Sequence, residues 1–135
     1  MKKVLIFITF SLMLLLSTNT YAQRLVGAWD IVGFSTLVVN EPGHTLSDIG
    51  TITFYKDASG ELTVDYSILG IETSENHAFR WAISQNMIAL QGGKSDFIRT
   101  WIIIENKAKE QKWQATDGKN TVYVLTLKKQ SKKKK

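Results

Sequence analysis

Short runs of alternating apolar and polar residues, separated by turn residues, recur along most of this chain. In Glu61–Ser67, for example, Leu62, Val64 and Tyr66 alternate with polar residues. A period of two places the apolar side chains on one face of a β-strand and the polar side chains on the other. The pattern therefore predicts an all-β protein whose strands each have one buried face.

Eight such strands are predicted, and short connections join most of them. Two stretches are not assigned to strands: the break at Asn40–His44, which holds the only proline, and a looser stretch at Leu69–Asn76. An open sheet of consecutive antiparallel strands would leave two unpaired edges, whereas closure removes them. We therefore expect an eight-stranded antiparallel up-and-down barrel, with an interior either filled by side chains or holding one small ligand. The predicted strands are Leu25–Val39, Gly50–Lys56, Glu61–Ser67, His77–Ser84, Met87–Gln91, Phe97–Glu105, Glu110–Thr116 and Thr121–Leu127.

The first 22 residues differ from the rest of the chain. Met1–Lys3 is basic, Val4–Leu16 is an apolar run of 13 residues, and Ser17–Ala22 is polar and rich in small residues. This order predicts a secretory signal peptide at residues 1–22, cleaved after Ala22. The alternative, a retained membrane anchor, needs roughly 20 apolar residues. We expect an exported protein, periplasmic or secreted, with a barrel domain at residues 23–129.

Charge is divided unevenly along the chain. The net charge is +5, but six lysines lie in the last eight residues, and the rest of the predicted mature chain has nine basic and 12 acidic residues. Residues 130–135 are predicted to form a disordered basic tail. The alternative is weak contact with an anionic membrane surface or polyanion. No aromatic residue lies among these lysines, which argues against specific nucleic-acid binding.

Several short motifs, in this order, resemble those of bacterial lipocalin-like domains. Gly27-Ala28-Trp29 resembles the Gly-Xaa-Trp signature of the first lipocalin strand. The match extends over the predicted mature chain, in the segments Leu25–Val32, Gly50–Phe54 with the Asp57–Gly60 turn, Arg80–Ser84, Met87–Leu90 and Val124–Lys129.

The resemblance implies structural roles at the base of the barrel for Gly27 and Trp29. In lipocalins this tryptophan plugs the closed end, and an arginine near the C-terminus stacks on it. No arginine follows Arg99 in this chain. Lys128 and Lys129 are the candidates to cover Trp29 through a cation–π contact.

Residues for catalysis or metal binding are sparse. The two histidines, His44 and His77, are 33 residues apart and the chain has no cysteine. A zinc site would need both histidines and carboxylates brought together by the fold. We expect both histidines to be exposed to solvent, and we predict no metal, no cofactor and no enzymatic activity. Convergence of the histidines with carboxylates would favour an enzyme instead.

Aromatic residues on the predicted strands are the candidates for binding a ligand, because small-molecule sites are usually apolar cavities with a few polar groups. The same residues would otherwise simply form the core. The predicted function is binding of a small apolar or amphipathic molecule inside the barrel. The alternative is a filled, non-enzymatic scaffold that binds a protein or an anionic surface through its loops or lysine tail. The candidate lining residues are Phe34, Phe54, Tyr66, Phe79, Trp81, Trp113 and Tyr123.

Overall fold

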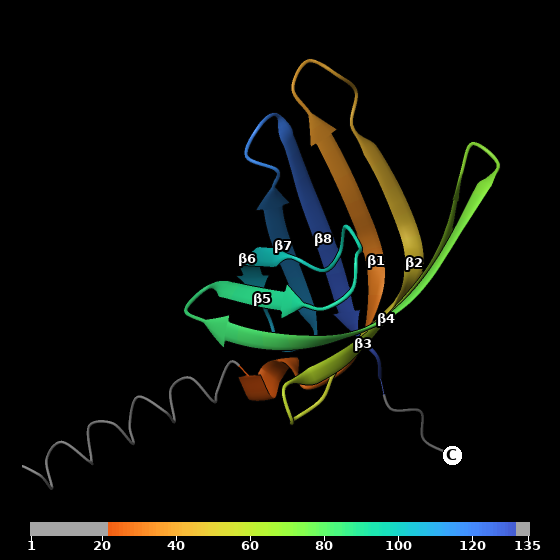
Figure 1. Ribbon diagram of the computed structural model, residues 1–135. Helices are drawn as coiled ribbons and strands as arrows, with labels where there is room; N and C mark the ends of the chain where they lie inside the picture. Colours follow the sequence, from red (N-terminus) through yellow and green to blue (C-terminus); the bar gives the residue numbers. More distant parts are fainter. Residues whose placement is uncertain (1–21, 132–135) are drawn as a thin grey trace, which may run out of the picture.

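Eight antiparallel strands form a closed barrel in the order of the sequence (Figure 1). The computed structural model describes residues 22–131. Most of the predicted signal peptide and the last four lysines therefore lie outside the described residues. The strands are β1 (Gly27–Val38), β2 (His44–Phe54), β3 (Ser59–Ile68), β4 (Ile71–Ser84), β5 (Met87–Gln91), β6 (Thr100–Asn106), β7 (Glu110–Thr116) and β8 (Thr121–Lys129).

Pairing between the first and last strands closes the barrel. β1 pairs with β8 from Trp29 opposite Lys129 to Val38 opposite Thr121. The registers of β1 with both neighbours shift between Ile31 and Gly33. A bulge of this kind bends a long strand and increases its twist, which suits a strand that follows the barrel wall. The predicted all-β, eight-stranded up-and-down barrel is confirmed.

Several predicted strand boundaries were wrong, and three of them differ from the structure by three or more residues. β2 begins at His44 rather than Gly50, and β4 begins at Ile71 rather than His77. In both stretches pairing to a neighbouring strand compensates for a weak local β pattern. β6 begins at Thr100 rather than Phe97, because residues 95–98 form a turn in which the Ile98 N–H donates to the Ser95 carbonyl.

β2 and β3 pair over only part of their lengths. Their ladder runs from Gly50 opposite Val64 to Phe54 opposite Gly60. Beyond it, residues 44–47 of β2 pair only with β1, and residues 65–68 of β3 pair only with β4. The far part of the β3–β4 hairpin consequently leans away from β2 (Figure 1). The wall of the barrel is therefore open on this side, at the end opposite the N-terminal helical turn.

The other end of the barrel is filled. A helical turn at residues 22–25 lies beneath it, and the buried Leu25 side chain joins the core. Trp29 and Trp101 are both fully buried, and their indole N–H groups donate to the carbonyls of Leu25 and Phe97, at 2.8 and 2.9 Å. These bonds satisfy two indole donors that would otherwise be buried without acceptors. None of the helical structure within residues 22–131 is long enough to cross a bilayer.

Candidate functional site

A pocket of about 510 Å³ lies at the open end of the barrel. It lies where β2 and β3 separate beyond Gly50. Residues of β1, β2, β3 and β8 form its walls. Its size is within the range of small-molecule sites. Its lining residues are Phe34, Thr36, His44, Thr45, Leu46, Tyr66, Ile68, Leu69, Asp96 and Tyr123.

Three of the seven predicted lining residues meet at this pocket: Phe34, Tyr66 and Tyr123. The rings of Phe34 and Tyr123 are stacked, with centroids 6.0 Å apart. Phe34 also packs against Phe97, with centroids 4.6 Å apart. The aromatic part of the lining therefore comes from Phe34 of β1, Tyr66 of β3 and Tyr123 of β8, and Phe97 of the β5–β6 loop packs against Phe34.

The other four predicted residues lie together elsewhere, in the filled half of the barrel. The Phe54 ring contacts those of Phe79, Trp81 and Trp113 edge-on, at centroid distances of 5.6, 5.4 and 5.9 Å. Trp113 in turn lies 6.4 Å from Trp101. Edge-to-face packing of this kind is typical of a solid core. These four residues do not line the pocket at the mouth.

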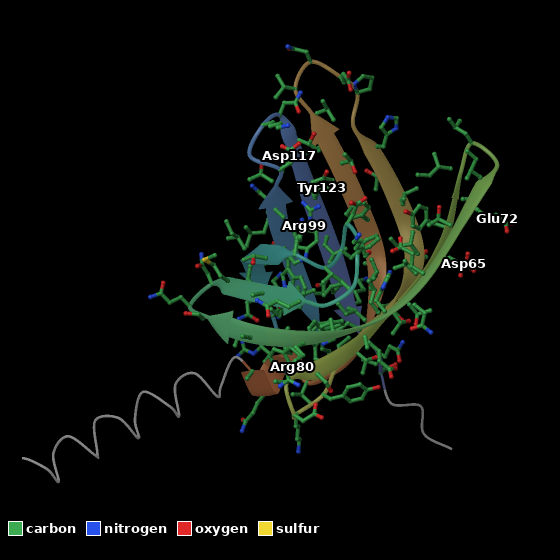
Figure 2. The ribbon with its side chains drawn as sticks, viewed as in Figure 1. Asp65, Glu72, Arg80, Arg99, Asp117 and Tyr123 are labelled. Carbon is green, nitrogen blue, oxygen red and sulfur yellow. The ribbon has the colours of Figure 1, made fainter. Side chains whose placement is uncertain are left out.

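Arg99 is the charged residue of this region that the sequence prediction missed. Its guanidinium carbon lies 4.4 Å from the centroid of the Tyr123 ring, and its Nη2 lies 3.9 Å from Asp96 Oδ1. Both partners line the pocket, and Figure 2 shows Arg99 beside Tyr123 within the barrel. The sequence holds the alternating series Phe97, Arg99, Trp101, Ile103, which a strand would place on one face. Phe97 and Arg99 lie before β6, however, so the turn and not strand alternation places Arg99.

His77 is half-buried rather than exposed, which corrects the expectation for this residue. It lies on the same face of β4 as Phe79 and Trp81, and its Nε2 is 3.0 Å from Glu75 Oε1. His44 is exposed, as expected, and lies at the rim of the pocket. Within residues 22–131, no three His, Asp or Glu side chains come together in a way that could hold a metal ion.

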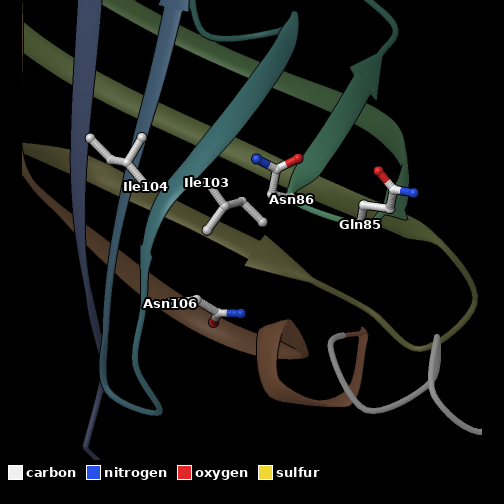
Figure 3. Close-up of a pocket in the computed structure, with 5 residues that line it drawn as sticks. All are labelled: Gln85, Asn86, Ile103, Ile104 and Asn106. Atoms are coloured by element: carbon white, nitrogen blue, oxygen red, sulfur yellow. The ribbon is translucent and has the colours of Figure 1, made fainter.

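Two further pockets lie outside the mouth. One, of about 540 Å³, is bounded by the β4–β5 turn and β6, and amides and isoleucines line it: Gln85, Asn86, Ile103, Ile104 and Asn106 (Figure 3). The other, of about 500 Å³, lies against the N-terminal turn and is lined by Ala22, Gln23, Val26, Lys56 and Trp81. The Trp81 indole beside it donates to the Ser59 carbonyl at 2.9 Å, which gives Trp81 a structural partner. The second lining pairs one aromatic residue, Trp81, with a cation, Lys56, whereas three aromatic residues, Phe34, Tyr66 and Tyr123, line the pocket at the mouth.

The base of the barrel has the arrangement that the resemblance implies. Trp29 is 0% exposed, and Lys129 Nζ lies 5.5 Å from the centroid of its ring. Lys128, the other candidate, is exposed. The Lys129 side chain also packs against Gly27, where a Cβ would lie 3.2 Å from Lys129 Cε. Lys129, on the last strand, therefore covers the buried Trp29 ring.

Comparisons with known proteins agree at the level of the fold. No family model matches the sequence, and no curated protein matches it. A lipocalin-like protein of Bacteroides uniformis superposes with a TM-score of 0.53 and 12% identity, over 79% of this chain and 99% of that one. An uncharacterized protein of Bacteroides eggerthii has a TM-score of 0.49 and 15% identity, over 76% of this chain and 98% of that one. Since the pairing order, the buried Trp29 and the first superposition agree, this chain has the closed eight-stranded barrel fold of lipocalin-like proteins.

Proposed function

We propose that this protein is an exported, non-enzymatic binding protein that holds a small apolar or amphipathic molecule at the mouth of its barrel. The proposal rests on one observation: a pocket of about 510 Å³ with three aromatic residues in its lining opens where β2 and β3 separate. A lipocalin-like barrel is a scaffold suited to binding ligands, and its specificity lies in the residues of its open end.

The absence of catalysis is part of the proposal. The His77–Glu75 pair is the one contact between a histidine and a carboxylate among the salt bridges of the described residues. General acid–base catalysis needs such a pair within reach of a bound, reactive group. Neither residue lines the pocket at the mouth, so the pair has no substrate position beside it.

Binding of an uncharged, environment-sensitive dye such as Nile red tests the proposal. We expect saturable fluorescence enhancement with the native protein. Thr36→Trp adds an indole to the pocket lining and should weaken binding at least about tenfold, which is about 1.4 kcal/mol. Thr100→Trp adds the same indole at an exposed position on β6 and should leave binding unchanged. Equal binding by all three proteins, or no saturable binding by the native protein, would contradict the proposed site.

A second candidate function is binding of a protein partner by the loops at the mouth. Four large apolar side chains are exposed there, namely Leu37, Val39, Leu69 and Ile71. Exposed apolar clusters of this kind often mark interaction sites. Val39→Ser with Ile71→Ser, two exposed residues outside the pocket lining, would abolish capture of a partner while leaving Nile red binding intact if this second function holds.

Export and the lysine tail belong to the same proposal. If the signal peptide is removed after Ala22, the intact mass of the protein recovered from its producing cell should equal that of residues 23–135. The part of the tail that the structure describes contacts the barrel, since Gln130 Nε2 donates to Asp30 Oδ1 at 2.8 Å. Removal of residues 132–135 should therefore leave the melting temperature unchanged. It should also abolish any salt-sensitive adhesion to anionic vesicles, measured by co-sedimentation.

A further inference from the structure

We propose that the molecule bound at the mouth carries an anionic oxygen headgroup, a carboxylate, sulfate or phosphate, and that Arg99 receives this group. The inference deepens the proposed function and rests on it, because it assigns the ligand class to the same pocket. It follows from the position of Arg99, from its unmatched charge and from the apolar character of the remaining wall.

Arg99 is not itself a lining residue, but its guanidinium contacts two residues that line the pocket, Asp96 and Tyr123. The cation–π contact with the Tyr123 ring restricts the movement of the guanidinium. A planar group held in this way presents its remaining N–H donors in a fixed fork that matches the geometry of an oxyanion.

The charge of Arg99 is incompletely matched by the protein. Its Nε atom is buried and finds no hydrogen-bond acceptor within residues 22–131. The Asp96 carboxylate is 3.9 Å from Nη2, too far for a hydrogen bond, and its side chain is 74% exposed. A partly buried cation without a close anion is costly, whereas a charge-assisted hydrogen bond to a ligand would offset that cost. The site is therefore more favourable for an anion than for a neutral group.

Most of the remaining wall is apolar. Phe34, Leu46, Ile68 and Leu69 contribute hydrocarbon surface, while Thr36 and Thr45 contribute hydroxyl groups. His44 and the carboxylate of Asp96 also line the pocket, and the Asp96 side chain is mostly exposed to solvent, which screens its charge. A ligand that fits both parts has a hydrocarbon body and one charged end. A cationic amphiphile of the same length would meet the Arg99 charge unfavourably.

Displacement of Nile red by a matched series of amphiphiles tests the inference. The series consists of decanoate, decyl sulfate, decyl phosphate, decanol and decyltrimethylammonium, each used below its micelle concentration. With the native protein, at least one of the three anions should displace the dye at about tenfold lower concentration than decanol, the equivalent of one charge-assisted contact. The cation should be the weakest competitor. The order among the three anions identifies the headgroup.

Variants of Arg99 separate recognition from structure. Arg99→Gln should bring the affinities of the three anions down to that of decanol, each measured with the same variant. Arg80→Gln removes one charge at an exposed position of β4 and should keep the anion preference. Arg99→Lys should keep a reduced preference, since a point charge replaces the fork.

Three results would overturn the inference. If all anions and decanol displace Nile red from the native protein at the same concentration, the site does not recognise the headgroup. An anion preference that survives Arg99→Gln would assign the charge recognition to another residue. Failure of both Nile red and decanol to bind would remove the proposed function itself, whereas binding of decanol alone would leave that function standing and refute only the role of Arg99.

Discussion

Replacement of Trp29 tests the argument that the closed end of the barrel holds the fold together. The side chain is 0% exposed, its indole N–H donates to the Leu25 carbonyl at 2.8 Å, and Lys129 covers its ring. Trp29→Ala removes all three contacts at once. Trp29→Phe keeps most of the buried surface but removes the donor, so the pair of variants separates packing from hydrogen bonding.

The magnitudes follow from these contacts. Truncation of a fully buried aromatic side chain to alanine costs about 3–5 kcal/mol, because the cavity left behind collapses only in part. We expect Trp29→Ala to lie near the upper end, since the Leu25 carbonyl also loses its donor. For Trp29→Phe the lost hydrogen bond contributes about 1 kcal/mol and the smaller ring adds a similar cost. A domain of this size has a total stability of about 5–15 kcal/mol, so the alanine variant will be close to unfolding.

Urea denaturation followed by far-ultraviolet circular dichroism measures both effects, since the method does not depend on the tryptophan that is removed. The control is Ile102→Ala on β6, a side chain that is 43% exposed and should cost less than about 1 kcal/mol. If the unfolding free energy of Trp29→Ala lies within about 1 kcal/mol of that of the Ile102→Ala control, the role of Trp29 as a plug is refuted. If the alanine variant does not fold, the phenylalanine variant still tests the contribution of the hydrogen bond.

Three further predictions concern the turns and hairpins. Gly60→Ala would place a Cβ 2.6 Å from the Thr53 carbonyl oxygen, so its melting temperature should fall well below that of the native protein. Leu69 has a φ of 53° and is 96% exposed, so Leu69→Asn should raise the unfolding free energy in urea by about 1 kcal/mol. The backbone N–H groups of Lys119 and Thr121 hold the pKa of Asp117 below its ordinary value of 3.8. Its stabilising effect is therefore present above that pH and is lost as the pH falls through the lowered pKa, and Asp117→Asn should flatten the acid limb of a stability–pH curve.

The architecture could be predicted from the sequence because alternation is a local property. In Glu61–Ser67 the predicted inward residues Leu62 and Val64 are fully buried, while Thr63 and Asp65 are exposed. Closure followed from the count of strands and from the cost of unpaired edges. The pairing of Thr121 with Val38 then confirmed it.

Strand limits were less predictable because pairing, rather than local pattern, sets them. The stretch from Ile71 to Asn76 is mostly polar, yet every residue in it pairs with β3. Phe97 shows the opposite failure, since its β-favouring neighbourhood suggested a strand and the Ser95 turn prevents one. Tertiary contacts override propensity in both cases.

The division of the aromatic residues between core and pocket could not be predicted, because every one of them faces inward. Phe54 and Tyr66 lie on neighbouring strands and both look like ligand-lining residues in the sequence. They differ only in their distance from the point where the β2–β3 ladder ends, at Gly50 opposite Val64. At this end of the ladder, β2 and β3 approach so closely that a Cβ on Gly50 would clash with the Thr63 carbonyl.

The end of the β2–β3 ladder is the physical link between the fold and the proposed function. Toward the base of the barrel, paired strands bring the rings of Phe54, Trp81 and Trp113 into contact inside the barrel. Toward the mouth, the separated ribbons cannot close over Phe34 and Tyr123, so apolar surface stays accessible. Under the proposed function, stability and ligand binding would depend on different halves of the barrel, and Arg99, beside the Tyr123 ring, would contact the headgroup of the ligand.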